Sequence, residues 1–284
     1  MRITDNRVRS LIGLYTAGLA GRYGSGEVKA ILRAVFEQGL QWDAAQLEMR
    51  RDEVLSESEL VKVYTPFERL QAGEPLQYVL GEVHFHGLSL GVAPGVLIPR
   101  PETEELVQRI IEDVRTPSHI VDIGTGSGCI ALALKGAYPE AQVVAIDRSA
   151  EALAIAEVNG ARNGLRVEWM LANILDPDLV IPPTDLIVSN PPYVPRSEEA
   201  SLDSVVRDNE PHIALFVEDD DPLLFYRAIA HQALQALSKG GHLWFEGHYR
   251  YATGVGELLS ALGFTTVEVL HDLSGNPRYI HAVR

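Results

Sequence analysis

Cysteine, basic residues and long apolar runs are all scarce in this chain of 284 residues. The chain has one cysteine, Cys129, so no internal disulfide can form, as is typical of proteins from a reducing compartment. No apolar run approaches the roughly 20 residues of a membrane-spanning helix. Arg7 and Arg9 interrupt the first apolar stretch, which is not typical of a signal peptide. We therefore expect a cytoplasmic protein with no membrane partner.

The scarcity of basic residues also bears on the class of partner. Lys and Arg total 24 against 39 Asp and Glu, which gives a formal net charge of -15. Such a balance repels a polyanion at long range, so DNA is not expected as a partner. The chain is long enough for a catalytic domain and a smaller second domain.

Residues 1–80 follow a helical pattern, with apolar residues three and four positions apart. Further helix starts are predicted at Asp43, Ser56 and Thr65, each followed three residues later by Gln or Glu as in a capping box. Pro66 would then occupy the first position of the last helix. We expect a small helical bundle, for which the pattern leaves both simple attachment and substrate docking open.

Residues 82–92 change to a period of two around Gly87, which predicts a β-hairpin, and we expect residues 81–98 to link the two domains. His84 and His86 share one face of this hairpin. No third ligand or HExxH pattern accompanies them, so no metal site is predicted.

Residues 99–284 alternate between strands and helices, which predicts right-handed βαβ units and a parallel sheet covered by helices. The two final strands are joined by a Ser-Gly-Asn-Pro turn without a helix, so one of them must run antiparallel. The expected strands are 119–123, 142–146, 166–171, 185–189, 241–246, 264–270 and 278–283, and the expected helices are 102–114, 128–137, 149–163, 222–237 and 250–262. This α/β order resembles the seven-stranded, Rossmann-like sheet of class I S-adenosylmethionine-dependent methyltransferases.

A glycine-rich turn follows the first strand of this region and comprises Gly124, Thr125, Gly126, Ser127 and Gly128. Glycine allows the backbone to approach a ligand closely, and the next helix offers free N–H groups. Asp147 ends the following strand, where a carboxylate can accept both hydroxyls of a ribose. The pattern predicts a nucleoside ligand, and GxGxG after Asp122 resembles an S-adenosylmethionine site more than a dinucleotide site.

The tetrapeptide Asn190, Pro191, Pro192 and Tyr193 follows strand 185–189, at the sheet edge where open α/β sheets bind ligands. The prolines restrict the backbone, so the Asn190 side-chain oxygen and the Pro191 carbonyl can accept both hydrogens of an NH2 group. Tyr193 would present a flat face to a planar acceptor. We predict that these four residues bind the substrate and that Asn190, Pro191 and Tyr193 are catalytic.

Five segments resemble the release-factor glutamine methyltransferases, also called the HemK or PrmC family, over residues 73–284. They are Gly73 to Tyr78, Leu97 to Glu104, Asp122 to Gly128, Asn190 to Tyr193, and Glu210-Pro211 with Ala214-Leu215. The resemblance implies methylation of the glutamine side-chain nitrogen (N5) in the Gly-Gly-Gln loop of class 1 peptide chain release factors, in support of translation termination. It also implies S-adenosyl-L-methionine as cofactor, S-adenosyl-L-homocysteine as product, and Gly124 to Gly128, Asp147 and Asn190 as cofactor contacts.

Two segments depart from the family pattern. Asn173, followed by Ile174, stands where the family usually has an acidic residue near the adenine, although its side-chain oxygen can still accept a hydrogen bond from the adenine amino group. We therefore keep Asn173 and Ile174 as expected cofactor contacts. A charge run at 216–221 replaces the usual glycine-rich segment and is interpreted as a solvated loop.

Three alternatives remain open from the sequence. An adenine-N6 nucleic-acid methyltransferase shares the tetrapeptide but would show a basic groove and a target-recognition insertion. A ribosomal-protein glutamine methyltransferase would perform the same chemistry on another protein. An inactive nucleotide-binding module would need only the glycine turn and Asp147. We expect residues 1–80 to be the docking domain, residues 99–284 to be catalytic, and the protein to be a monomer.

Overall fold

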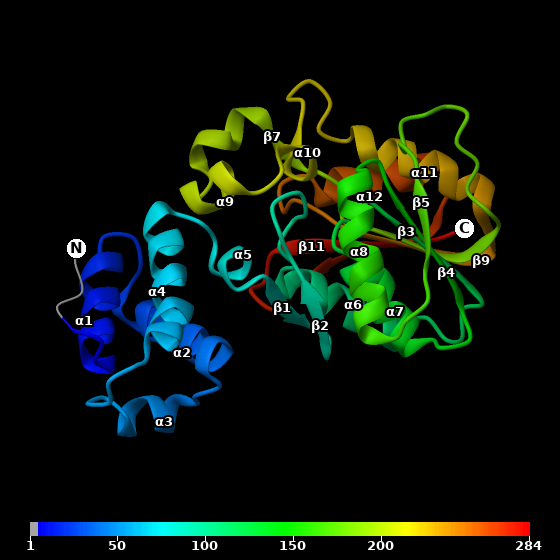
Figure 1. Ribbon diagram of the computed structural model, residues 1–284. Coiled ribbons are helices and arrows are strands. Elements are labelled where there is room, and N and C mark those ends of the chain that lie inside the picture. Colours follow the sequence, from blue (N-terminus) through cyan, green and yellow to red (C-terminus); the bar gives the residue numbers. More distant parts are fainter. Residues whose placement is uncertain (1–4) are drawn as a thin grey trace. The chain divides into compact units, whose positions relative to one another are not determined.

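The computed structural model describes residues 5–284, which form two compact units divided between Gly81 and Glu82 (Figure 1). The first four residues of the predicted helical domain therefore lie outside the described residues. Each unit has its own buried apolar core. Among the described residues, no helix combines the length and the apolar content required to cross a membrane.

Residues 5–81, the described part of the first unit, contain five helices, which confirms the helical pattern predicted there. They are α1 (Val8–Leu19), α2 (Ser25–Leu40), α3 (Ala44–Met49), α4 (Glu57–Ala72) and α5 (Leu76–Leu80). The predicted capping boxes at Asp43 and Ser56 are present, and each satisfies backbone N–H groups at the start of its helix. Tyr15 is fully buried in the core and donates a hydrogen bond of 2.6 Å to the Val63 carbonyl.

The helix start predicted at Thr65 is wrong, because α4 continues through this position with Pro66 in its interior. Proline removes one backbone hydrogen bond from a helix interior and normally weakens it. Here the apolar face continues on both sides, since Val63, Phe67 and Leu70 are all buried in the same core. Burial of this face stabilises the helix as one element.

The second unit begins with the predicted hairpin, β1 (Glu82–Phe85) and β2 (Leu88–Gly91). His86 and Gly87 form its turn, both with positive φ, as a two-residue hairpin turn requires. Phe85 and Leu90 are buried in the core of the second unit, so the hairpin is part of that unit.

The sheet of the second unit has seven strands in the order β10-β11-β9-β6-β3-β4-β5, which confirms the predicted class of fold. The strands are β3 (His119–Ile123), β4 (Gln142–Asp147), β5 (Glu168–Leu171), β6 (Thr184–Ser189), β9 (Leu237–Glu246), β10 (Thr265–His271) and β11 (Pro277–Val283). All neighbouring pairs from β5 to β9 are parallel, whereas β11 runs antiparallel to both β9 and β10.

Helices cover both faces of this sheet (Figure 1). The helices of the unit include α6 (Pro101–Asp113), α7 (Cys129–Ala137), α8 (Ala150–Asn163), α11 (Leu224–Ala236) and α12 (Ala252–Leu262). The cores formed with α6 and α7 and with α11 and α12 are separate clusters on opposite faces of the strands. Alternate strand residues point into each cluster, as the two-residue repeat of a strand requires.

The segment between β6 and α11 contains short elements that the sequence pattern did not predict. They are β7 (Val194–Pro195), the 3-10 helix η1 (Arg196–Ser201), α9 (Ser204–Asn209), α10 (His212–Leu215) and β8 (Phe216–Val217). The prediction of a solvated loop from residue 216 is wrong for its first two residues, because Phe216 and Val217 are buried and pair with β7. Only the acidic part of that run, 218–220, is exposed.

Candidate active site

A cavity lies at the carboxyl ends of β3, β4 and β6. The chain proceeds from β3 to β4 and β5 on one side and then returns to place β6 on the other side of β3. Such a reversal of strand order opens a crevice, and ligands of α/β sheets bind there.

The glycine turn after β3 forms one wall of the cavity through Gly124 and Gly126. Both have positive φ, 78° and 55°, a conformation that side chains rarely adopt. A Cβ atom on Gly126 would meet nothing within 4 Å, so the turn presents bare backbone to the open space. A ligand can therefore approach this backbone directly.

Thr125, Ser127 and Gly128 do not line the cavity. The Thr125 hydroxyl donates a hydrogen bond of 2.6 Å to the Asp122 carboxylate, beneath the turn. Ser127 is buried, and Gly128 lies so close to α8 that a Cβ atom would be 3.1 Å from Ala156. These residues hold the shape of the turn.

Asp122 is a buried carboxylate that accepts hydrogen bonds from the glycine turn and from the helix after it. It is fully buried, and the same oxygen that accepts from Thr125 also accepts from the Ala131 backbone N–H at 3.2 Å. Burial raises the pKa of Asp122 to about 7, against the lowering effect of these two hydrogen bonds. Its other oxygen has no hydrogen-bond partner among residues 5–284.

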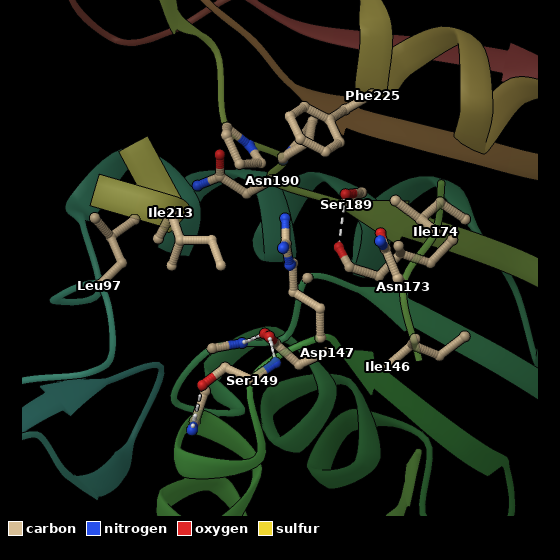
Figure 2. Close-up of a pocket in the computed structure, with 18 of the residues that line it drawn as sticks. Leu97, Ile146, Asp147, Ser149, Asn173, Ile174, Ser189, Asn190, Ile213 and Phe225 are labelled. Atoms are coloured by element: carbon tan, nitrogen blue, oxygen red, sulfur yellow. Dashed lines mark hydrogen bonds between the residues drawn. The ribbon is translucent and has the colours of Figure 1, made fainter. Parts of the chain in front are cut away.

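Asp147 ends β4 and lines the cavity with its carboxylate fixed on both sides (Figure 2). One oxygen accepts from the Gly126 N–H and the other from the Ser149 N–H, each at 2.9 Å. Ser149 in turn caps α8 by accepting from Ala152 at 3.1 Å. A carboxylate has about four acceptor positions, so two remain for a ligand with adjacent hydroxyls.

Asn173 and Ile174 line the cavity beside Ile146 and Ala172 (Figure 2). The Asn173 side-chain oxygen accepts a hydrogen bond of 3.1 Å from the Leu175 N–H, which fixes the amide at the wall. The apolar neighbours offer a surface on which a flat ring can pack, with one polar amide at its edge.

Asn190 follows β6 and is held by a chain of hydrogen bonds. Its side-chain nitrogen donates to the Thr103 hydroxyl at 3.2 Å, and that hydroxyl donates to Glu246 at 2.7 Å. The carboxylate can only accept when it is ionised, so the Thr103 hydroxyl is committed as its donor and accepts from Asn190. The side-chain oxygen of Asn190 thereby remains available as an acceptor at the cavity.

Pro191 and Pro192 line the cavity, but Tyr193 does not. The Tyr193 side chain packs into the apolar cores, and its hydroxyl donates to Glu246 at 3.4 Å. Burial raises the pKa of both the Tyr193 hydroxyl and the Glu246 carboxyl. Tyr193 and Thr103 thus donate to the two oxygens of one buried carboxylate.

Two of the family-like segments meet at Glu210, whose side chain is buried. Its carboxylate accepts from the Ile98 N–H at 3.1 Å and forms a hydrogen-bonded ion pair with Arg100. Leu97, which precedes Ile98, and Ile213, three residues after Glu210, both line the cavity (Figure 2). The ion pair therefore joins two segments that form one wall.

The cavity also contains residues that the sequence did not single out. They include Gly95, Val96, Arg148, Ser149, Ile213, Phe225 and Ile229. Arg148 and Ser149 could have been predicted as cavity residues, because they directly follow Asp147 in the sequence. The others come from loops or distant helices, for which the sequence shows no local pattern.

Comparison with protein families gives two matches. The model described as "Methyltransferase small domain" matches residues 101–214, and the model described as "PrmC N-terminal domain" matches residues 16–81. The two matched regions belong to the second and the first unit, respectively.

Curated relatives match almost the whole chain. A release factor glutamine methyltransferase from Bacteroides thetaiotaomicron is 40% identical over 263 residues, which cover 92% of this chain and 95% of that protein. One of the same name from Deinococcus radiodurans is 35% identical over 280 residues, which cover 98% of this chain and 99% of that protein.

Solved methyltransferase structures share the fold over about 70% of this chain at low sequence identity. A methyltransferase from Pyrococcus furiosus has a TM-score of 0.53 and 19% identity, and the match covers 69% of this chain and 89% of that one. A 16S rRNA methyltransferase from T. thermophilus, solved with AdoMet and guanosine, has a TM-score of 0.51 and 18% identity, with 72% and 49% covered. Both matches concern the fold alone.

Proposed function

Because this chain belongs to the family of release factor glutamine methyltransferases, we propose that it methylates the glutamine side-chain nitrogen (N5) in the Gly-Gly-Gln loop of class 1 peptide chain release factors. The methyl donor is S-adenosyl-L-methionine, and the product is S-adenosyl-L-homocysteine. The orientation of Asn190 carries the proposal, because it leaves an amide oxygen to accept from a substrate NH2 group.

The cofactor fits the wall formed by the glycine turn, Asp147 and Asn173. The Asp147 carboxylate would accept the two ribose hydroxyls, and the bare backbone of Gly124 and Gly126 would lie along the ligand. Asn173 and Ile174 would contact the adenine, one through its amide and one through its apolar side chain. Thr125, Ser127 and Gly128 would act indirectly by maintaining the turn.

When bound, the cofactor supplies a methyl group on a positively charged sulfur. The chain's own task is to hold the acceptor nitrogen in line with that methyl group. The Asn190 oxygen and the Pro191 carbonyl would accept both N–H hydrogens of the glutamine amide. These acceptors would also stabilise the positive charge that develops on the nitrogen during transfer.

Pro191 and Pro192 would contact the glutamine side chain, since both line the cavity. For Tyr193 we propose a positioning role: its hydroxyl shares the Glu246 carboxylate with Thr103, and Thr103 orients Asn190. Tyr193 would thus be linked to Asn190, which contacts the acceptor, through three successive hydrogen bonds.

The release factor would dock on the first unit as well as at the cavity. A single tripeptide loop offers little area for selection, whereas specific protein interfaces usually bury more than 1,000 Å² by general experience. A net charge of -15 disfavours DNA as an acceptor. We further propose that the enzyme acts as a monomer in the cytoplasm, where release factors act.

The direct experiment incubates the full chain with labelled S-adenosyl-L-methionine and candidate acceptors, followed by mass mapping of the methylated residue. We expect label on the glutamine of the Gly-Gly-Gln loop and none after Asn190→Ala, with the helical content unchanged. Label on a ribosomal protein in preference to the release factor would show that the acceptor is the ribosomal protein. Label on duplex DNA would overturn the assignment to a protein substrate.

A further inference from the structure

A second cluster of polar side chains lies on the sheet away from the cavity. It comprises Asp113 at the end of α6, His242 on β9 and His281 on β11. None of the three lines the cavity. His242 lies four residues before the end of β9, toward the amino ends of the parallel strands.

The strand register explains why the two imidazoles meet. Val283 is paired with His242 and His281 with Trp244, so His242 and His281 lie on one sheet face, displaced by two residues. Their rings stack at 5.2 Å between centroids with an interplanar angle of 8°. The indole of Trp244 also stacks on the His281 ring, with 4.3 Å between the centroids.

The distances between the three candidate donor atoms suit a single metal ion. His242 Nδ1 and His281 Nε2 are 2.9 Å apart, and Asp113 Oδ2 is 3.8 Å from the first and 3.6 Å from the second. In a tetrahedral zinc site with bonds of 2.0–2.1 Å, neighbouring ligand atoms are roughly 3.3–3.4 Å apart. The three observed distances between donor atoms lie on either side of this value. Displacements of a few tenths of an ångström would therefore bring the three atoms to the spacing of a zinc site.

A fourth residue orients His281 from behind. Glu268 on β10 is the cross-strand partner of His281, and its carboxylate lies 3.8 Å from His281 Nδ1, the nitrogen that faces away from the cluster. A carboxylate behind the second imidazole nitrogen is the usual arrangement at histidine ligands of zinc, where it fixes the ring and its tautomer.

The cluster is exposed to solvent mainly at Asp113. The His281 side chain is 6% exposed, whereas that of Asp113 is 48% exposed. An ion can therefore enter past the carboxylate and reach the buried imidazole, with a solvent position left for a water ligand.

We propose that Asp113, His242 and His281 bind a divalent transition-metal ion of the zinc class, with Glu268 as a positioning residue. Two nitrogen donors and one carboxylate are a ligand set that favours zinc over magnesium or calcium. The site joins α6, β9 and β11, so a bound ion would stabilise the folded chain through its preference for that state.

The test titrates the full-length protein, freed of metal with a chelator, with zinc chloride in a calorimeter. We expect one zinc ion per chain and a rise in the midpoint of thermal unfolding that grows with free zinc. His242→Gln should remove this stoichiometric binding, and Asp113→Asn, on the exposed side, should remove it independently. Glu268→Gln should keep one ion per chain but weaken the affinity roughly 10- to 100-fold.

His84→Gln is the matched control, because His84 is an exposed histidine of the hairpin in the same unit. It should bind zinc as the unaltered chain does, and methyl transfer by His242→Gln should stay unchanged and show that the fold is intact. The proposal fails if the unaltered chain binds no zinc, or if His242→Gln and Asp113→Asn bind it as tightly as His84→Gln. The 2.9 Å contact would then be only a hydrogen bond between two imidazoles.

Discussion

The side-chain nitrogen of Asn190 donates to the hydroxyl of Thr103 at 3.2 Å, which sets the direction of the Asn190 amide. Thr103 lies at the start of α6, 87 residues earlier in the chain, and its own proton is directed to the buried Glu246. An amide can present either its oxygen or its NH2 group to a substrate. This contact selects the oxygen, which is the group that a glutamine NH2 requires.

The first prediction concerns that contact. Thr103→Val keeps the shape of the side chain but removes the hydroxyl, so the Asn190 amide loses its orienting partner and Glu246 loses a donor. We expect the turnover number to fall about 10- to 100-fold, the equivalent of 1.4–2.8 kcal/mol. Steady-state kinetics with a release factor measure this loss. The dissociation constant of the cofactor should change little.

Thr103→Ser is the matched control, because it retains the hydroxyl and should restore most of the turnover. Equal losses in Thr103→Val and Thr103→Ser would show that packing at this position matters and the hydroxyl does not.

The second prediction concerns cofactor binding by Asp147. Asp147→Ala removes a carboxylate whose two oxygens are already fixed by backbone N–H groups at 2.9 Å. A charge-assisted hydrogen bond contributes roughly 1.5–3 kcal/mol, so we expect the dissociation constant to rise at least about tenfold. Calorimetry with S-adenosyl-L-methionine measures it, with the exposed Asp178→Ala as control. An unchanged constant in folded Asp147→Ala protein would remove this residue from the cofactor site.

The third prediction concerns the pH dependence of stability. Burial raises the pKa of Asp122 from 3.8 to about 7, so the folded state holds the proton more tightly than the unfolded state. The stability from this group is therefore complete below pH 4 and is lost as the pH rises to about 7. Asp122→Asn mimics the protonated acid without titrating. Urea unfolding at several pH values should show a shallower decline for Asp122→Asn, and parallel curves would contradict the assignment.

The fourth prediction concerns the buried carboxylate of Glu210. Glu210→Ala leaves Arg100 without its partner and the Ile98 N–H without its acceptor. We expect the free energy of unfolding to fall by about 2–3 kcal/mol, less than for a fully buried pair because the Arg100 side chain is 31% exposed. Urea denaturation measures the change. In a double-mutant cycle with Arg100→Met the two losses should not add, and additive losses would mean that the pair does not interact.

Much of the catalytic fold could be predicted because its strands have a strong local pattern. Ile120, Val121 and Ile123 are apolar and buried, as expected of a parallel strand buried on both faces, and the glycine turn follows this strand directly. The carboxyl ends of such strands meet at one sheet edge, so Asp147 and Asn190 could be placed together from sequence order alone.

The features that the sequence did not predict depend on contacts between residues that are distant in sequence. The Tyr193 hydroxyl donates to Glu246, 53 residues later, and no spacing rule links the two. Pro66 and the Phe216–Val217 strand were mispredicted for a related reason: local preference favoured a break or a loop, but burial against distant residues prevailed.

The last prediction concerns docking by the first unit. Deleting residues 1–81 removes one compact unit and leaves the other with its own core. We expect the Michaelis constant for an intact release factor to rise about tenfold or more, because a second contact adds affinity through a high effective concentration. A short Gly-Gly-Gln peptide, which reaches only the cavity, should be methylated with an unchanged Michaelis constant.

A finer test of docking replaces Met49, an apolar side chain that is 81% exposed on the first unit, with serine. Its control is Val158→Ser, at a side chain that is 61% exposed on the second unit. Met49→Ser should weaken only the intact substrate, and equal effects of the deletion on peptide and release factor would contradict the docking role.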